Sequence, residues 1–235
     1  HVCLRWVRAK AMYDAAERHP ELTTMISPPP HFMRGDTAVR KLINEGFIGE
    51  PRNVVVQSYA DAYVNPNSPK HWRQDWSMSG FNVLDMGMMI EVMHRWLGYA
   101  TKVTAMAQTF TKSRPDGQGG MAPVERPDTV SVIAELASGA IATINCSGVA
   151  KHAAASNGFE IFGSEGVIRY LTATDTIFVG KNSDSALTEL KLKPEEERRW
   201  TAEADFIAAV RAGSRQVEPS FTDGLKYMEM TEAIF

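Results

Sequence analysis

The change of pattern at Gly98 constrains the fold more than any other feature of this sequence. Ahead of Gly98 the chain reads mainly as helices and loops, whereas after it β-prone runs follow one another at short intervals. Two turns between these runs, 137–139 and 163–165, are short enough for antiparallel hairpins. We therefore expect a large and mainly antiparallel sheet. A short β-prone run, Thr23–Ser27, comes ahead of the sheet. The predicted strands of the sheet are Asn53–Tyr63, Lys102–Phe110, Thr129–Leu136, Ala140–Val149, Gly158–Phe162, Gly166–Tyr170, Thr176–Val179 and Leu187–Leu192.

Helices are predicted on both sides of the strand-rich region, from apolar residues at helical spacing and from residues that begin or end helices. Asp36 is the expected N-cap of the second helix, and Gly98 closes the third. Helices on both sides of a strand-rich region predict an α+β domain with an open sheet and helices on one face. The other face is a candidate interface between copies of the chain. The predicted helices are Val7–Arg18, Thr37–Asn44, a helix from the Ser79–Met89 run to Leu97, Thr201–Ala212 and Asp223–Phe235.

Composition excludes several classes of partner for this 235-residue chain. A net charge of −3 gives no electrostatic case for nucleic acid or an anionic membrane. No stretch reaches the roughly 20 apolar residues of a membrane span. Cys3 and Cys146 provide neither a disulfide framework nor a zinc site, and we interpret them as reduced thiols of a cytoplasmic protein.

One run, Ser79–Met89, carries a family resemblance. Its sequence, SGFNVLDMGMM, resembles the substrate-site helix of the Gfo/Idh/MocA oxidoreductases, which reads roughly G-G-G-x-L-x-D-x-G-x-H. Asp85 and Gly87 match that pattern, and Met89 stands at the histidine position. The resemblance extends from Met25 to Phe235, and its further matching segments are 39–50, Trp72-Arg73, 159–166 and 219–225.

The resemblance implies an NAD(P)-dependent oxidation or reduction of a sugar, inositol or related polyol. It also implies a Rossmann domain with a G-x-G-x-x-G turn ahead of the substrate domain. We expect residues 1–27 to be a remnant of that domain and 28–235 to be the substrate-binding and oligomerisation domain. Gly117–Ala122 fits G-x-G-x-x-A formally, but prolines follow it, so a flexible loop and no cofactor site is expected there. NAD or NADP is implied for the family, and no cofactor is predicted for this chain.

Asp85 and Met89 are one helical turn apart and would face the same side of a helix. Methionine cannot accept a proton, and the lysine of the family's Glu-Lys-Pro motif has no counterpart near Leu4-Arg5-Trp6. Little or no dehydrogenase turnover is therefore expected. Asp85 is either a retained polyol-binding group or a structural acid paired with Arg73 or a backbone amide.

A polar loop is predicted before this helix, at 65–79, and it supplies the remaining candidates for substrate binding. Trp72 and Arg73 either stack on a sugar ring and bind a carboxylate, or anchor the loop to the core. His71 either swings toward the site or is an ordinary loop histidine. His94 is half a turn out of phase with Asp85, so we expect it at the surface or an interface. Met86, Met88, Met89 and Met93 are expected to fill the core, and no metal site is predicted.

Two other functions remain open from the sequence. One is a non-catalytic module that binds a small polar ligand or forms homo-oligomers, with a dimer through the sheet face. In the other, a partner chain supplies a dinucleotide-binding domain. Exposed apolar surface on Val7–Ser27 would favour a partner chain that supplies the dinucleotide-binding domain. A compact homodimer with that segment repacked would favour the non-catalytic module.

Overall fold

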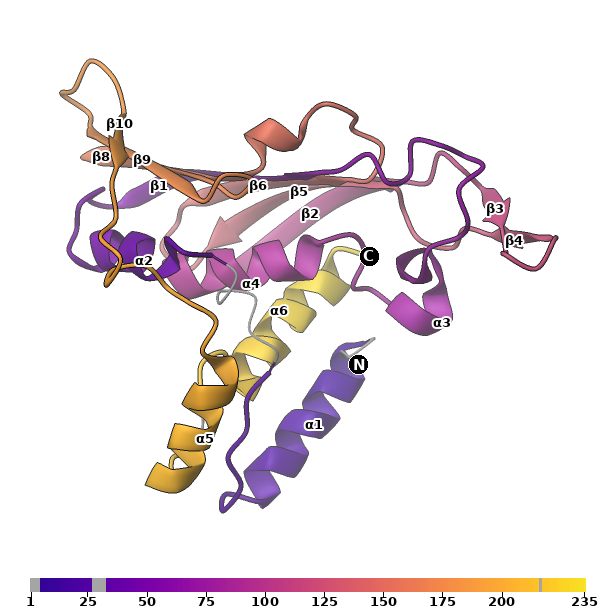
Figure 1. Ribbon diagram of the computed structural model, residues 1–235, viewed down its shortest axis with the longest axis horizontal. Helices are drawn as coiled ribbons and strands as arrows, with labels where there is room; N and C mark the ends of the chain where they lie inside the picture. The colour runs from indigo at the N-terminus through magenta and orange to yellow at the C-terminus, as the bar shows by residue number, and fades with distance from the viewer. Residues whose placement is uncertain (1–4, 27–32, 216) are drawn as a thin grey trace.

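The sheet is the central element of the computed structural model, which describes residues 5–26, 33–215 and 217–235 (Figure 1). Its eight strands lie in the order β10-β9-β8-β7-β1-β6-β5-β2. Neighbouring strands are antiparallel except β1 and β6, which are parallel. The predicted α+β fold with a mainly antiparallel sheet is confirmed. The strands are β1 (Pro51–Tyr59), β2 (Ala100–Gln108), β5 (Thr129–Leu136), β6 (Ile141–Ser147), β7 (Gly158–Gly163), β8 (Gly166–Leu171), β9 (Thr176–Lys181) and β10 (Thr188–Leu190).

Helices cover one face of this sheet. Figure 1 shows α2, α4 and α6 beneath the strands, with α1 and α5 projecting further away from the sheet. On the opposite face, no α-helix formed by the described residues covers the strands (Figure 1). The helices are α1 (Trp6–Arg18), α2 (Asp36–Asn44), α3 (Trp76–Ser79), α4 (Met86–Leu97), α5 (Ala202–Ala212) and α6 (Phe221–Ala233), with 3-10 turns η2 (Trp72–Gln74) and η3 (Ala154–Ser156).

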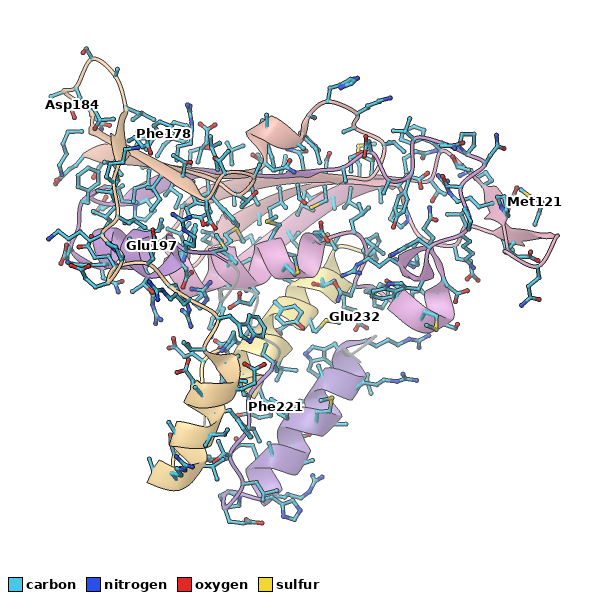
Figure 2. The ribbon with its side chains drawn as sticks, viewed as in Figure 1. Met121, Phe178, Asp184, Glu197, Phe221 and Glu232 are labelled. Atoms are coloured by element: carbon cyan, nitrogen blue, oxygen red, sulfur yellow. The ribbon has the colours of Figure 1, made fainter. Side chains whose placement is uncertain are left out.

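Alternation along the strands explains which face is covered. In β5, Val130 and Val132 are buried against the helical layer, whereas Ile133 is 53% exposed on the other side. Helix α4 contributes Trp96, whose ring packs edge-on against Phe159 and Tyr170 of the sheet. Side chains fill the layer between sheet and helices (Figure 2). The core therefore lies between the sheet and α4, which fixes α4 against the middle of the sheet.

The methionines of α4 divide between core and surface. Met86 and Met93 are fully buried, as predicted, and Met89 is partly buried against the same core. Met88 is 41% exposed, so the prediction for that residue is wrong. Its side chain lies on the outward side of the helix.

Asp36 is the clearest correction to a predicted cap. The N-cap of α2 is Gly35, and Asp36 lies inside the first turn and is fully buried. Its carboxylate accepts a hydrogen bond from Trp96 Nε1 at 2.9 Å and forms ion pairs with Arg95 and Arg198. Asp36 therefore joins α2 to α4 and to the segment before α5.

Three further predictions of local structure are changed. Over the predicted strand Thr23–Ser27 the described residues contain only an isolated bridge at Thr24, and Ser27 lies outside them. The predicted loop 65–79 contains η2 and α3. Gly117–Ala122 spans the turn of a hairpin formed by β3 (Ser113–Pro115) and β4 (Met121–Pro123), with Met121 at its outer end (Figure 2). No helix among the described residues is long and apolar enough to span a membrane.

Candidate functional site

The parallel pairing of β1 and β6 creates the site. Because the strands run in the same direction, their carboxyl ends meet at one edge of the sheet, with Ser58 opposite Cys146 and Tyr59 opposite Ser147. The segment that leads into α4 faces this edge. Between them lies a cavity of about 260 Å³, which we call the Asp85 cavity. Its polar lining residues are Ser58, Tyr63, His71, Arg73, Asp85 and Ser147.

The Ser79–Met89 run does not form one helix, contrary to prediction. Helix α3 ends at Ser79, Gly80 follows with φ 56°, and α4 begins only at Met86. Between them Leu84 adopts φ 51°, a left-handed conformation that costs a non-glycine residue roughly 1–2 kcal/mol. Arg73 Nε donates to the Leu84 carbonyl at 2.8 Å and so helps to hold this turn. The turn presents the next residue to the cavity.

Asp85 is that next residue, and it is the N-cap of α4. Its half-buried carboxylate makes no capping hydrogen bond. Among the described residues no ion pair or hydrogen bond reaches this carboxylate, and Arg73 is bonded to Leu84 instead. The pairing with Arg73 or a backbone amide that a structural acid would need is not seen among the described residues. The Asp85 carboxylate thus lines the cavity as an acceptor that has no partner in the part of the chain that the structure describes.

His71 and Tyr63 line the same cavity as Asp85 and contact each other. The backbone N–H of Arg73 donates to His71 Nδ1 at 3.2 Å, which places the proton of the neutral ring on Nε2. Tyr63 Oη lies 3.4 Å from the same Nδ1. Burial, and then the positive charge of Arg73, lower the pKa of His71, while Asp85 opposes them. His71 is therefore an uncharged group at neutral pH. Burial also raises the pKa of Tyr63.

Trp72 and Met89 lie outside the cavity lining. The Trp72 ring is 41% exposed, and the Arg73 guanidinium stacks over it at 4.2 Å from the ring centroid. Trp72 therefore orients Arg73 and lies at the surface rather than in the core. Met89 packs against the core one turn into α4, and its sulfur offers no proton acceptor comparable to an imidazole.

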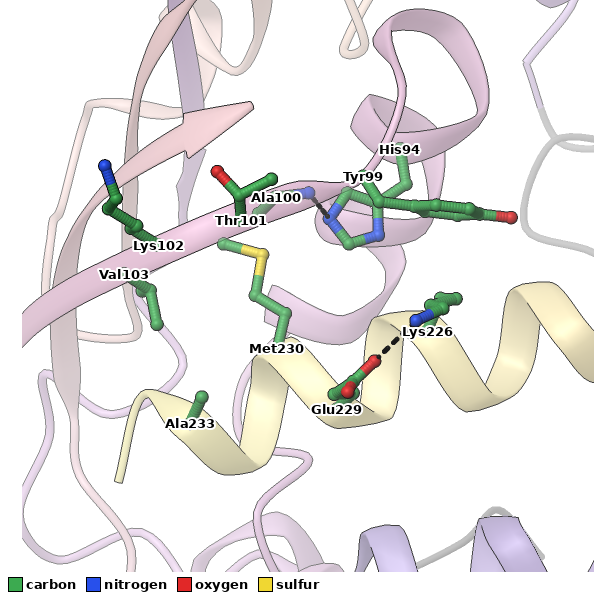
Figure 3. A pocket seen from close by; sticks show the side chains of 10 residues that line it. All are labelled: His94, Tyr99, Ala100, Thr101, Lys102, Val103, Lys226, Glu229, Met230 and Ala233. Atoms are coloured by element: carbon green, nitrogen blue, oxygen red, sulfur yellow. Dashed lines mark hydrogen bonds and ion pairs between the residues drawn. The ribbon is translucent and has the colours of Figure 1, made fainter. Parts of the chain in front are cut away.

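His94 is separate from this site, as its phase on the helix predicts. It lines a different pocket at the other end of α4 and is only 6% exposed. The expectation of a surface histidine is therefore wrong. The buried imidazole has one polar atom satisfied, because Nε2 accepts a hydrogen bond from the backbone N–H of Ala100 at the start of β2 (Figure 3).

The sequence did not indicate the contribution of Ser58, Tyr63 and Ser147. Tyr63 was expected at the end of a strand, but β1 ends at Tyr59 and Tyr63 lies in the loop beyond it. The fully buried Arg114 fixes that loop by donating to the carbonyls of Tyr63 and Asn65 at 2.6 and 2.7 Å. No local signal in the sequence marks this long-range contact.

Comparison with protein families identifies the domain. Residues 37–169 match the family described as the GFO/IDH/MocA C-terminal domain. The chain belongs to the Gfo/Idh/MocA family. The matched segment includes β1, α4 and the strands that line the Asp85 cavity.

Relatives of this Gfo/Idh/MocA chain include sugar dehydrogenases. A levoglucosan dehydrogenase from Pseudarthrobacter phenanthrenivorans is 27% identical over 266 residues, an alignment covering 96% of this chain and 67% of that protein. The structure of levoglucosan dehydrogenase in complex with NADH and L-sorbose superposes with a TM-score of 0.86 at 26% identity, covering 99% of this chain and 68% of that one. An NAD binding oxidoreductase from Klebsiella pneumoniae has the same fold, with a TM-score of 0.87 at 22% identity and the same coverage.

Proposed function

We propose that this chain binds a sugar or polyol in the Asp85 cavity, as the substrate domain of an NAD(P)-dependent oxidoreductase. The observation that carries the proposal is the Asp85 carboxylate, which faces the cavity without a partner among the described residues. A carboxylate accepts hydrogen bonds from hydroxyl groups. The relative crystallised with levoglucosan or L-sorbose supports a sugar as the ligand.

Each neighbour of Asp85 has a role in this proposal. Arg73 donates from one side of the cavity, and Trp72 fixes its guanidinium by stacking. Neutral His71 presents Nε2–H as a donor, and the Tyr63 hydroxyl supplies a further polar contact. The ligand is therefore an uncharged, hydroxyl-rich molecule that offers donors to Asp85 and acceptors to Arg73 and His71.

The nicotinamide cofactor is implied by the family, and we propose that the described residues do not supply its site. Dinucleotides bind where a strand leads through a glycine-rich turn into a helix. Within residues 5–26, 33–215 and 217–235, Gly117–Ala122 joins two hairpin strands instead. We derive no hydride step from these residues, and we propose weak or no turnover for the 235-residue chain with Met89 in place of the histidine.

Helix α1 and the residues just after it expose apolar side chains that a dinucleotide-binding unit would cover. We propose that residues 1–27 are the part of the chain that belongs with such a unit, whether in the same protein or in a partner. Ala9 packs inward and the Trp6 N–H donates to Glu232 of α6, yet Val7 and Leu22 are 64% and 54% exposed. This exposed apolar surface supports the proposal, whereas the contact of α1 with α6 supports the alternative of a self-contained binding module.

Two further proposals concern assembly and location. We propose that the chain forms a homodimer through the uncovered sheet face, where Met106 and Ile133 are 83% and 53% exposed. A reducing, cytoplasmic location is proposed because the Cys146 thiol is free and buried.

Calorimetric titration of the 235-residue chain tests sugar binding. Levoglucosan, L-sorbose and myo-inositol are the titrants, and at least one is expected to bind. Asp85→Asn should weaken that binding at least about tenfold, because it replaces an acceptor carboxylate by an amide. The matched control is Asp61→Asn, because Asp61 is an exposed aspartate in the loop after β1 and does not line the cavity. Equal loss in both variants, or no binding of any sugar, would contradict the proposal.

NADH and NADPH are titrated in a separate experiment. No heat is expected at millimolar nucleotide. Micromolar binding would overturn the proposal that the described residues lack the cofactor site, and would leave the sugar proposal to be judged by Asp85→Asn alone.

A further inference from the structure

The side of β1 that faces the helices changes from apolar to polar at the carboxyl end of the strand. Val54, Val56 and Ser58 share this side, because side chains alternate along a strand. Val54 and Val56 are fully buried in the core, whereas Ser58 is 8% exposed and lines the Asp85 cavity. A serine therefore stands where a third valine would continue the apolar row, on the sheet side of the cavity.

The hydroxyl of Ser58 has no hydrogen-bond partner in the part of the chain that the structure describes. The residue directly opposite on β6 is Cys146, whose thiol is only a weak donor and acceptor. Ser58 Oγ is not one of the unpartnered side-chain atoms that the fold seals from solvent, so a molecule in the cavity can reach it. A buried hydroxyl that lacks a hydrogen bond costs free energy and calls for an explanation.

Ser147, at the end of β6, provides a comparison within the same cavity. It also lines the cavity and is buried to a similar degree, with 6% of its surface exposed. Its Oγ lies 2.8 Å from Thr129 Oγ1 and accepts the backbone N–H of Val149 at 3.2 Å. The hydroxyl of Ser147 is therefore satisfied by the protein, and it holds the end of β6 in place. Ser58 has no such structural role.

The second pocket, at the other end of α4, shows how polar groups are paired where no ligand is needed. There Lys226 Nζ is 2.9 Å from Glu229 Oε2, and the two charges satisfy each other (Figure 3). In the Asp85 cavity, the Asp85 carboxylate and the Ser58 hydroxyl both lack a partner among the described residues. Two reachable polar groups without partners in one cavity indicate that a ligand supplies the partners.

Asp85 and Ser58 belong to the same part of the cavity. Burial, and then the negative charge of Asp85, raise the pKa of Cys146 to about 12. The charge of Asp85 therefore reaches the β1–β6 pair at the level of Ser58, because Ser58 and Cys146 are register partners. A carboxylate only accepts hydrogen bonds, whereas a serine hydroxyl both donates and accepts. A molecule that satisfies both groups carries more than one hydroxyl, as a polyol does.

We propose that Ser58 binds a second hydroxyl of the sugar or polyol and makes the cavity selective for that hydroxyl. The inference rests on the proposed binding in the Asp85 cavity and deepens it. Asp85 accepts from one hydroxyl of the ligand, and Ser58 Oγ forms a hydrogen bond with another. A ligand that lacks the second hydroxyl leaves Ser58 unpaired in a filled cavity, so it is rejected.

Calorimetry with deoxy sugars tests this selectivity. The probe is whichever of levoglucosan, L-sorbose and myo-inositol binds most tightly, together with its set of monodeoxy derivatives. Ser58→Ala should weaken binding of the parent compound about tenfold. One monodeoxy derivative should bind the wild-type chain about tenfold more weakly than the parent does, and Ser58→Ala should bind that derivative no more weakly than the wild-type chain. The loss from removing the hydroxyl that Asp85 holds should persist in Ser58→Ala.

Unfolding by urea without sugar separates a ligand contact from a structural one. Ser58→Ala should leave the urea midpoint unchanged or raise it, because the hydroxyl that it removes has no protein partner. Ser147→Ala is the matched control, and it should lower the midpoint because it removes two hydrogen bonds. A residue that served only the fold would lower the midpoint on truncation, as Ser147 is expected to do.

Several results would overturn the proposal. They are equal affinity of wild type and Ser58→Ala for the parent compound, deoxy losses that all persist in Ser58→Ala, or a urea midpoint lowered as much by Ser58→Ala as by Ser147→Ala. Loss of binding in Asp85→Asn without any effect of Ser58→Ala would leave the proposed function standing and refute the role of Ser58. A wild-type chain that binds none of the three sugars would refute both.

Discussion

Gly148 allows the Tyr63 ring to close one wall of the Asp85 cavity. A Cβ at position 148 would lie 2.3 Å from Tyr63 Cδ2, so the ring must move when alanine is introduced. We expect Gly148→Ala to lower the free energy of unfolding by about 1–3 kcal/mol, as overpacking does, and to weaken sugar binding. Urea unfolding and calorimetry measure the two effects. In a Tyr63→Ala background the stability cost should disappear; an unchanged cost there would show that the clash is not with Tyr63.

Sequence and structure agree on part of this site. Arg73 and Asp85 were predicted from motif segments and His71 from its place in the loop before the helix, and the structure brings the three into one cavity. Motifs locate residues that are close together in the chain. Tyr63 and Ser147 reach the cavity only because β1 and β6 pair in parallel, and that pairing depends on contacts between segments far apart in sequence.

At the scale of elements, buried charges join α2 to α4. Glu91 and Arg95 of α4 pair at 2.9 Å, and Arg95 also binds the fully buried Asp36 of α2. Burial raises the pKa of Glu91 from 4.5 to about 6, although Arg95 opposes the shift. The folded protein therefore holds this proton more tightly than the unfolded chain does. Its stabilising effect is complete below about pH 4.5 and is lost as the pH rises through about 6.

Glu91→Gln should remove this dependence on pH. Glutamine resembles the protonated carboxyl, so the stability of the variant relative to wild type should rise by on the order of 2 kcal/mol between pH 4 and 7. Urea unfolding over that range measures the difference. Glu45→Gln is the matched control, because Glu45 is an exposed partner of Lys41 at the same helical spacing. A parallel pH profile for Glu91→Gln and wild type would contradict the assignment.

Helices and strands whose own residues show a clear periodic pattern were predicted well. Those whose conformation depends on contacts with residues elsewhere in the chain were not. Thr129–Leu136 is the same strand in prediction and structure because its β-branched residues alternate between two environments. The Ser79–Met89 run has a helical apolar pattern, yet Gly80 and Leu84 adopt positive φ and break it. Arg73 stabilises that break from outside the run, so the run itself carries no sign of it.

At the scale of the whole molecule, sequence predicted the layers but not the order of strands. Helical and strand patterns show that one sheet face is covered, because the covered face needs apolar residues from both elements. The order β7-β1-β6 inserts the first strand between two late ones. Local patterns do not encode such an insertion, since it is decided by which strands bury the most surface together.

The uncovered face carries the last prediction, which concerns assembly. Ile133 lies on β5 in this face and is 53% exposed, and Met106 of the paired strand β2 is 83% exposed beside it. In a symmetric dimer a change at position 133 enters the interface twice. Ile133→Glu should therefore raise the dimer dissociation constant at least about a hundredfold, because each copy buries an unpaired charge. Sedimentation velocity measures the shift from dimer to monomer. Val210→Glu on α5, where Val210 is 51% exposed, is the control that should leave the dimer intact. A wild-type chain that sediments as a monomer at all concentrations, or a dimer that Val210→Glu disrupts equally, would exclude this face as the interface.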